Sequence, residues 1–292
     1  QLVAEGDRLA FSTDSYVIDP LFFPGGNIGK LAICGTANDV AVSGAIPRYL
    51  SCGFILEEGL PMETLKAVVT SMAETARAAG IAIVTGDTKV VQRGAADKLF
   101  INTAGMGAIP ANIHWGAQTL TAGDVLLVSG TLGDHGATIL NLREQLGLDG
   151  ELVSDCAVLT PLIQTLRDIP GVKALRDATR GGVNAVVHEF AAACGCGIEL
   201  SEAALPVKPA VRGVCELLGL DALNFANEGK LVIAVERNAA EQVLAALHSH
   251  PLGKDAALIG EVVERKGVRL AGLYGVKRTL DLPHAEPLPR IC

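Results

Sequence analysis

The sequence has 292 residues, of which 49% are hydrophobic and 19% charged, a composition typical of a globular chain long enough for two domains. Its net charge of −8 argues against nucleic acid as the main partner, because neutralising phosphates requires a basic surface. No apolar run is long enough to span a bilayer, and the first residues lack the basic and apolar pattern of a secretory signal. We therefore predict no contact with a membrane.

Cysteine usage points to a reducing compartment. The seven cysteines include no C-x-x-C pair, so neither a zinc site nor a disulfide framework is predicted. The closest approach is Cys194-Gly195-Cys196, which we interpret as a buried thiol pair. We expect a cytoplasmic protein.

The first part of the sequence alternates between strand and helix patterns. Residues 28–44 are rich in Ala, Ile and Val and predict a buried helix. Apolar positions that recur every three or four residues predict an amphipathic helix between Pro61 and Gly80. The strand patterns cover residues 8–18, 48–57, 81–84 and 98–109, and the third of them runs into Gly86-Asp87-Thr88-Lys89.

A polar stretch at 110–124 separates this part from a second α/β unit. There we expect strands at 126–129, 197–201, 230–235, 256–263 and 267–271, and helices near 155–167, 180–194, 209–219 and 238–249. The glycine-rich loop 130–136 opens a further helix. The pattern predicts an α/β chain with an N-terminal domain of residues 1–110, a C-terminal domain of residues 111–283 and a flexible tail of residues 284–292.

Three aspartates stand at the edges of apolar elements, namely Asp14, Asp39 and Asp87. A carboxylate in an apolar run is costly unless it is paired or bound to a cation, and Mg²⁺ prefers a few carboxylates plus phosphate oxygens. The three could therefore gather around Mg-nucleotide. The alternative is that each caps a helix or turn, although Asp39 falls inside a helical run.

Other polar residues are candidates for phosphate binding and proton transfer. Lys89 could meet a phosphate as a point charge, and Arg180 could hold a phosphate or carboxylate in a fork. His135 could act as an acid or base near neutral pH, or could simply belong to a structural helix start. Glu228, next to a glycine, is expected at an exposed strand edge as a base, with a plain turn residue as the alternative.

The last residue of the sequence is Cys292, which follows Pro283, Pro287 and Pro289. Proline favours extended chain, so this segment is a poor candidate for core. Residues 284–292 could reach about 28 Å as an extended arm that carries one nucleophile. A frayed terminus that happens to contain cysteine is the alternative.

Several segments together resemble a known enzyme superfamily. The sequence is similar to the aminoimidazole ribonucleotide synthetase-like ATP enzymes over nearly its whole length. Within them, Gly133-Asp134-His135-Gly136 and the terminal Pro-Arg-Ile-Cys resemble the carbamoyl dehydratases of hydrogenase maturation. The superfamily motifs are found, in order, at residues 13–15, 38–47, 86–88, 177–182 and 227–229.

The resemblance implies a fold, a reaction and partners. The N-terminal sheet pairs with a second subunit in a homodimer, the C-terminal domain is an α/β sandwich, and ATP and Mg²⁺ lie in a cleft near the dimer interface. A carbamoyltransferase loads Cys292, ATP-dependent dehydration converts the S-carboxamide to S-thiocyanate, and cyanide passes to iron on a scaffold complex for [NiFe] hydrogenase. The motif positions implied for ATP are Asp14, Asn38, Asp39, Gly86, Asp87, Thr88, Lys89 and Arg180.

One departure from the family pattern and two alternatives remain. Family members carry a glycine-rich segment before the first strand that covers the nucleotide phosphates, and this sequence begins after it. We expect weak ATP binding if that segment has been removed. A thiamine monophosphate or selenide kinase of the same superfamily would leave the terminal cysteine idle, and a selenide enzyme would need a reactive cysteine before Cys34. A non-catalytic carrier would use only the tail thiol.

Overall fold

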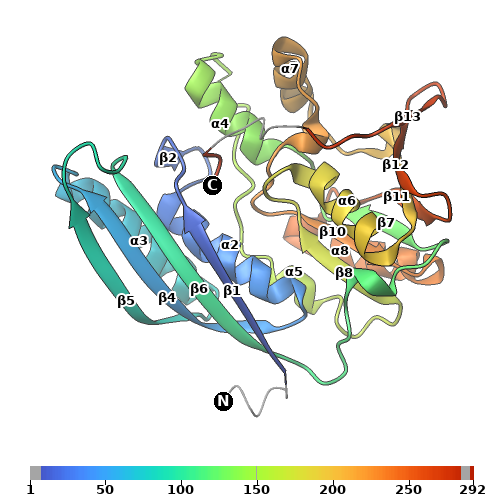
Figure 1. Cartoon of the computed structure of the whole chain (residues 1–292), viewed down its shortest axis with the longest axis horizontal. Helices are drawn as coiled ribbons and strands as arrows, with labels where there is room; N and C mark the ends of the chain where they lie inside the picture. Colours follow the sequence, from blue (N-terminus) through green and yellow to red (C-terminus); the bar gives the residue numbers. More distant parts are fainter. Residues whose placement is uncertain (1–7, 149, 284–289) are drawn as a thin grey trace.

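The N-terminal part forms a four-stranded sheet with helices on one face. The computed structural model describes residues 8–148, 150–283 and 290–292. The strands lie in the order β1-β6-β4-β5, with β4 and β5 parallel and the other neighbours antiparallel (Figure 1). Their bounds are Arg8–Tyr16 for β1, Ile46–Glu57 for β4, Ala82–Val91 for β5 and Leu99–Ile109 for β6. A two-stranded ribbon of β2 (Phe22–Phe23) and β3 (Gly26–Asn27) leads into the first helix.

Helix α2 (Ile28–Val42) is the central element of this domain. Asn27 caps it, because its side-chain oxygen accepts hydrogen bonds from the amides of Gly29 and Lys30. Nearly every residue of α2 is buried, which matches its Ala-, Ile- and Val-rich sequence. Helix α3 (Met62–Ala78) packs beside it through one apolar stripe, as its amphipathic pattern predicts.

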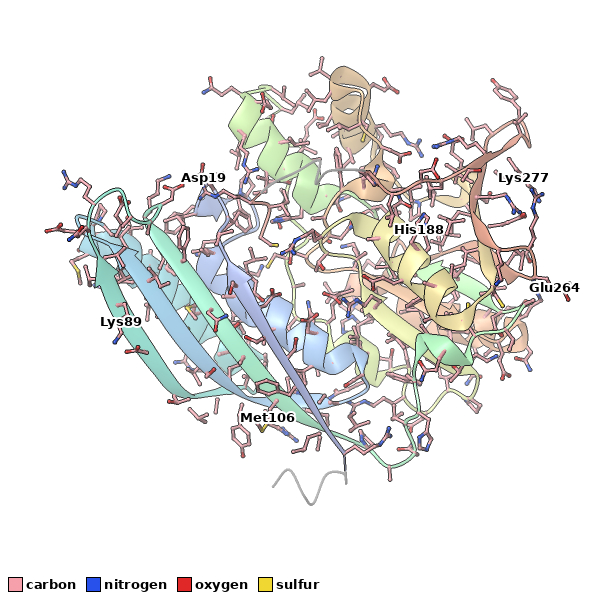
Figure 2. All side chains as sticks on the ribbon, in the orientation of Figure 1. Asp19, Lys89, Met106, His188, Glu264 and Lys277 are labelled. Atoms are coloured by element: carbon pink, nitrogen blue, oxygen red, sulfur yellow. The ribbon has the colours of Figure 1, made fainter. Side chains whose placement is uncertain are left out.

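The other face of this sheet is open and partly apolar. Phe11 is 67% exposed there and lies opposite Met106 in the β1–β6 register. Lys89 on β5 belongs to the same face, and Figure 2 labels both Met106 and Lys89. Pairing of this face with a second subunit stays a prediction.

The C-terminal part is built on a seven-stranded sheet in the order β13-β12-β9-β11-β7-β10-β8. Fully apolar strands such as β7 and β10 form its buried centre. The strands are β7 (Val125–Val128), β8 (Val172–Asp177), β9 (Gly197–Ser201), β10 (Leu231–Val235), β11 (Ala257–Val263), β12 (Gly267–Ala271) and β13 (Lys277–Thr279). The helices are α4 (Asp134–Glu144), α5 (Thr160–Gln164), α6 (Gly182–Cys194), α7 (Pro209–Leu218) and α8 (Ala240–His248), with short 3-10 turns between them.

The two-domain α/β fold is confirmed, with local corrections. Strand β5 continues through residues 86–89 to Val91, so this motif lies within an edge strand, beyond the strand end predicted at residue 84. Strands β8 and β13 were not predicted. The helix expected near 155–167 is only the short α5. The preceding residues form no helix, and Asn38 bonds to the carbonyl of Ala157 and the amide of Leu159.

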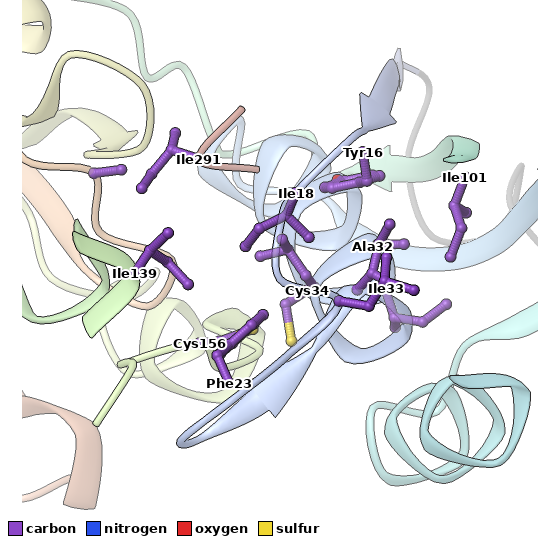
Figure 3. Close-up of a cluster of buried hydrophobic side chains, with 14 of the residues drawn as sticks. Tyr16, Ile18, Phe23, Ala32, Ile33, Cys34, Ile101, Ile139, Cys156 and Ile291 are labelled. Carbon is purple, nitrogen blue, oxygen red and sulfur yellow. The ribbon is translucent and has the colours of Figure 1, made fainter. Parts of the chain in front are cut away.

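The expectation that the tail is a poor candidate for core is wrong for Ile291. Its side chain is 2% exposed and belongs to a core cluster that also contains Tyr16, Ile18 and Ile139 (Figure 3). The prolines do not prevent this burial, because Ile291 follows them. The expected extended arm at 284–289 lies outside the described residues. Among the residues that the structure describes, none of the helices has the length and hydrophobicity that crossing a bilayer requires.

A candidate nucleotide and thiol site between the domains

Two of the predicted aspartates meet on the inner face of the N-terminal sheet. Asp14 on β1 lies in register with the buried Thr103, so its side chain points toward α2. The hydroxyl of Ser12 on the same strand donates a 2.7 Å hydrogen bond to Oδ2 of Asp39 on α2. Burial, followed by the negative charge of Asp39, raises the pKa of Asp14. Two half-buried carboxylates side by side form a place that favours a cation.

A chain of buried hydroxyl groups connects to the pair of Asp14 and Asp39 through Asp14. Tyr16 donates a 3.4 Å hydrogen bond to Asp14 Oδ2, and its oxygen is also 3.0 Å from the hydroxyl of Thr36. Thr36 in turn lies 2.5 Å from the hydroxyl of Thr103. Burial raises the pKa of Tyr16 well above its ordinary value, so the phenol stays a donor. Gly35 makes room for it, because a Cβ there would lie 2.4 Å from the tyrosine oxygen.

The C-terminal domain contributes Asp177, the last residue of β8. Its side chain is buried, and among the described residues Oδ1 has no hydrogen-bond partner. Burial, followed by the charge of Asp39, raises the pKa of Asp177 to about 7. Asp177 was predicted only as part of the 177–182 motif, although an aspartate at the start of an Asp-Ala-Thr-Arg-Gly-Gly segment was a usable signal.

Glu228 was expected at an exposed edge, and that expectation is wrong. The residue is 2% exposed. Asp155 keeps it buried by binding the backbone of its segment. Oδ1 of Asp155 accepts from the Glu228 amide at 3.1 Å and Oδ2 from the Gly229 amide at 3.2 Å, while Lys230 pairs with the same carboxylate at 3.3 Å. Oε1 of Glu228 has no partner among the described residues, and burial raises its pKa well above the ordinary value.

Cys292 lies between Arg180 and Glu228. A guanidinium N–H of Arg180 donates to its sulfur at 3.9 Å, and the amide of Val17 donates to its carbonyl oxygen at 2.9 Å. Burial, followed by the charge of Glu228, raises the pKa of the Cys292 thiol to about 12. The thiol, the orphaned carboxyl group and the arginine thus form one cluster.

His135 lies behind this cluster and is fully buried. Its Nδ1 is 2.7 Å from the hydroxyl of Ser154, and its Nε2 is 2.8 Å from the carbonyl oxygen of Ile291. Burial lowers its pKa. With both ring nitrogens engaged, His135 is less suited than Glu228 to remove a proton from a bound substrate, and its catalytic role stays untested.

The structure does not bring Asp87 to Asp14 within one chain. Asp87, Thr88 and Lys89 are exposed, and Lys89 pairs with Asp87 at 3.1 Å. The strand register places Gly86 in the row of Asp14, on the inner face, and places Asp87 on the open face in the row of Gly53, Asn102 and Ser15. Among residues 8–148, 150–283 and 290–292, no group of three His, Cys, Asp or Glu side chains is arranged to hold a metal.

Asn38 is buried and its side-chain amide is fully used in a contact between the domains, described above. This contact fixes the neighbouring Asp39 against the C-terminal domain. A direct contact of Asn38 with nucleotide stays a prediction.

Comparisons with known proteins identify the family. Residues 2–109 match the family described as AIR synthase related protein, N-terminal domain, and residues 121–272 match its C-terminal domain. A carbamoyl dehydratase HypE of Rhodobacter capsulatus is 50% identical over 294 residues, which covers 100% of this chain and 86% of the relative.

Solved structures agree with this family. E. coli HypE, a hydrogenase maturation protein, matches with a TM-score of 0.99 and 98% identity, over 100% of this chain and 90% of that chain. A HypE in complex with ATP matches with a TM-score of 0.94 and 47% identity, over 98% and 88%. A HypE–HypF complex matches with a TM-score of 0.92 and 48% identity, over 94% and 90%.

The superfamily's kinases share the fold alone. A thiamine monophosphate kinase from Aquifex aeolicus is 20% identical, with a TM-score of 0.67 over 92% of this chain and 89% of that chain. The sequence matches therefore favour the dehydratases over the kinase alternative. The chain belongs to the AIR synthase related family and, within it, to the HypE carbamoyl dehydratases of hydrogenase maturation.

Proposed function

We propose that this protein is an ATP-dependent carbamoyl dehydratase that converts an S-carboxamide on Cys292 into an S-thiocyanate. The observation that carries the proposal is the position of the Cys292 thiol, between the Arg180 guanidinium and the buried carboxyl group of Glu228, whose Oε1 has no hydrogen-bond partner among the described residues. The cyanide would then pass to iron on a scaffold complex for [NiFe] hydrogenase.

The chemistry requires three contributions from the protein. An amide oxygen is a poor leaving group, but phosphorylation by ATP turns it into phosphate, and loss of two N–H protons then leaves a nitrile on sulfur. The protein must bring the carboxamide to the γ-phosphate, neutralise charge and supply a base. The cluster around Cys292 contains groups of each kind.

We assign the base to Glu228 and the positive charge to Arg180. A carboxylate that is buried and not hydrogen-bonded is a stronger base than one in water, which suits removal of an amide proton. Arg180 lies beside the sulfur and could orient the carboxamide oxygen or a phosphate oxygen through its planar fork.

The residues present fit Mg²⁺ with ATP. Asp14 and Asp39 are two half-buried carboxylates side by side, and the charge of Asp39 helps to raise the pKa of both Asp14 and Asp177, so a divalent cation held by Asp14, Asp39 and phosphate oxygens would relieve this repulsion. Bound Mg²⁺ would supply charge neutralisation for the triphosphate. Asp87 and Lys89, with the neighbouring Gly86 and Thr88, keep their assignment to ATP as a proposal, and Asp87 also stays a proposed metal ligand.

Formation of a homodimer would bring Asp87 toward the site of a second copy. The open face of the N-terminal sheet carries exposed apolar side chains, among them Leu9 and Phe11 on the edge strand β1, and Asp87 and Lys89 lie on the same face in the opposite edge strand β5. Pairing of two such faces would bury the apolar groups and carry Asp87 toward the site of a second copy. We also propose a cytoplasmic location and a carbamoyltransferase as the partner that loads Cys292, which the HypE–HypF complex of a relative supports.

Intact mass spectrometry tests the function. After loading with a carbamoyltransferase and carbamoyl phosphate, ATP should reduce the mass of the tail by one water. Cys292→Ala should bind ATP as the wild type does and give no product. A carrier without enzyme activity would keep the carboxamide unchanged in ATP, and that result would reject the proposal.

A further inference from the structure

The described tail residues are held mainly by contacts other than the one at the sulfur of Cys292, which Arg180 meets at 3.9 Å. The carbonyl of Cys292 accepts from the amide of Val17, and the carbonyl of Ile291 lies 2.8 Å from His135 Nε2. The side chain of Ile291 is buried in the core cluster shown in Figure 3. Arg143 also donates to the carbonyl of Arg290. The side chain of Arg290 donates to the carbonyl of Val17 at 3.0 Å and pairs with Asp97 at 2.6 Å. Three successive residues are thus seated through backbone oxygens, one apolar side chain and one charged side chain.

The partners of His135 define its tautomer. A backbone carbonyl can only accept, so Nε2 must carry the hydrogen that points to Ile291. In a neutral ring Nδ1 then accepts, and the hydroxyl of Ser154 donates to it. Ser154 can do so because its oxygen already accepts from the amide of Cys156 at 3.2 Å. The chain from Cys156 through Ser154 and His135 to Ile291 has a donor and an acceptor at every link.

This chain is rigidly placed. His135 is fully buried, and its imidazole forms a T-shaped pair with the ring of Phe23, with 5.3 Å between ring centroids. Burial lowers the pKa of His135, which keeps the ring neutral at physiological pH. The hydrogen bond to the tail is therefore a fixed feature of the site and does not depend on the group carried by Cys292.

We propose that His135 is a positioning residue that seats the tail through the Ile291 carbonyl, whatever group the Cys292 sulfur carries. Thiol, carboxamide and thiocyanate would all be presented to Glu228 in the same register, because no seating contact involves the cargo. The proposal rests on the proposed function for the nature of that cargo. The seating itself is independent of it.

We call the contacts that hold residues 290–292 the seat. The seat separates the two steps of the reaction. Dehydration needs the tail in the cleft, beside Glu228, whereas loading by a carbamoyltransferase needs the thiol in a second active site. Removal of the His135 hydrogen bond should therefore slow dehydration and leave loading as fast or faster. A residue needed only for folding would slow both steps together.

Two substitutions differ by one methylene and separate the contacts of His135. The amide of His135→Asn reaches about as far as Nδ1, so it can meet Ser154 and not Ile291. The amide of His135→Gln reaches about as far as Nε2, so it can donate to Ile291. We expect alkylation of Cys292 by iodoacetamide, without ATP, to become about tenfold faster in the Asn variant and to stay near the wild-type rate in the Gln variant.

Peptide mapping of the same samples supplies the control. Cys34 and Cys156 are fully buried in the same core, so their slow labelling shows that the fold is intact. Single-turnover dehydration of a pre-loaded tail should be slowed in the Asn variant and largely rescued in the Gln variant. Equal labelling rates for Cys292 in the wild type and the Asn variant, or equal effects of Asn and Gln, would overturn the proposal.

A tail variant covers the case in which neither His135 variant folds. Ile291→Ala removes buried apolar surface from the seat and should also speed the labelling of Cys292. Wild-type labelling in Ile291→Ala would show that the seat is not what protects the thiol. A wild-type protein that labels slowly yet never loses water from a loaded tail would reject the proposed function and leave the seat in place.

Discussion

Burial, followed by the charge of Glu228, raises the pKa of the Cys292 thiol, although the two residues belong to segments far apart in the sequence. A thiol with a pKa of about 12 is protonated at neutral pH and is a poor nucleophile. The seated tail is therefore suited to carry a group and unsuited to acquire one. We therefore expect loading and dehydration to occur in two different positions of the same cysteine.

The seated thiol predicts a pH dependence of tail binding. Its pKa is raised in the seated state, so seating is complete below the ordinary cysteine value of 9.0 and is weakened as the pH rises toward about 12. We expect the fraction of seated tail to fall over this interval. Hydrogen–deuterium exchange of the C-terminal peptide as a function of pH would measure it, with Cys292→Ser as the control that removes the thiol titration. Identical pH profiles for the two proteins would contradict the prediction.

Glu228→Gln should separate binding from chemistry. The amide keeps the size of the side chain and removes the base, so we expect ATP binding and carbamoyl loading to persist and dehydration to fall by on the order of 100-fold or more. Single-turnover mass spectrometry of a pre-loaded tail would measure the rate. A variant that dehydrates at the wild-type rate would exclude Glu228 as the base.

Asp39→Asn should lose Mg-ATP turnover. The substitution removes one of the two adjacent charges offered to the cation but can keep the hydrogen bond from Ser12. Ser12→Ala is the matched control, because it removes that hydrogen bond and leaves the carboxylate in place. A phosphate-release assay should show a large loss in Asp39→Asn and a small one in Ser12→Ala. Wild-type turnover in Asp39→Asn would reduce Asp39 to a structural helix residue.

Asp177→Asn should stabilise the metal-free protein in a pH-dependent way. The folded pKa of about 7 lies above the ordinary aspartate value of 3.8, so ionisation of the buried carboxyl group opposes folding increasingly as the pH rises from 4 to 7. The gain in free energy of unfolding should be small near pH 4 and on the order of 2–4 kcal/mol at pH 8. Urea denaturation of both proteins at the two pH values would measure it, and a gain that is equal at both would contradict the assignment.

The sequence alone was sufficient to predict the elements whose hydrophobic pattern is local. The period of α3 and the apolar run of α2 needed no tertiary information. Strand β8 was missed because Lys173 and Arg176 interrupt its apolar pattern, and only its antiparallel pairing with β10 makes it a strand. The register of β5, which decides which face Asp87 occupies, likewise depends on its neighbour β4.

For the site, the sequence indicated residue types and not their surroundings. Asp14 and Asp39 were predicted together and do lie together. Burial of Glu228 was not predictable, because it results from Asp155, a residue distant in sequence that binds two backbone amides. The position of Ile291 was not predictable for the same reason. The prolines before it say something only about the preceding segment, whereas the contact that holds Ile291 comes from His135, a residue distant in sequence.

Two glycines in helices provide a test of the packing beneath Asp14. In Gly35→Ala on α2, the new methyl group would lie 2.4 Å from the oxygen of the buried Tyr16, so the tyrosine must move away from Asp14. We expect a loss of roughly 1–3 kcal/mol in the free energy of unfolding, together with weaker Mg-ATP binding. Gly213→Ala on α7 meets open space and should instead stabilise the protein by about 0.5–1 kcal/mol, because alanine has the higher helix propensity. Chemical denaturation and ATP titration of both variants would show opposite changes in stability, and a harmless Gly35→Ala would mean that the Tyr16 hydroxyl does not support the acidic pair.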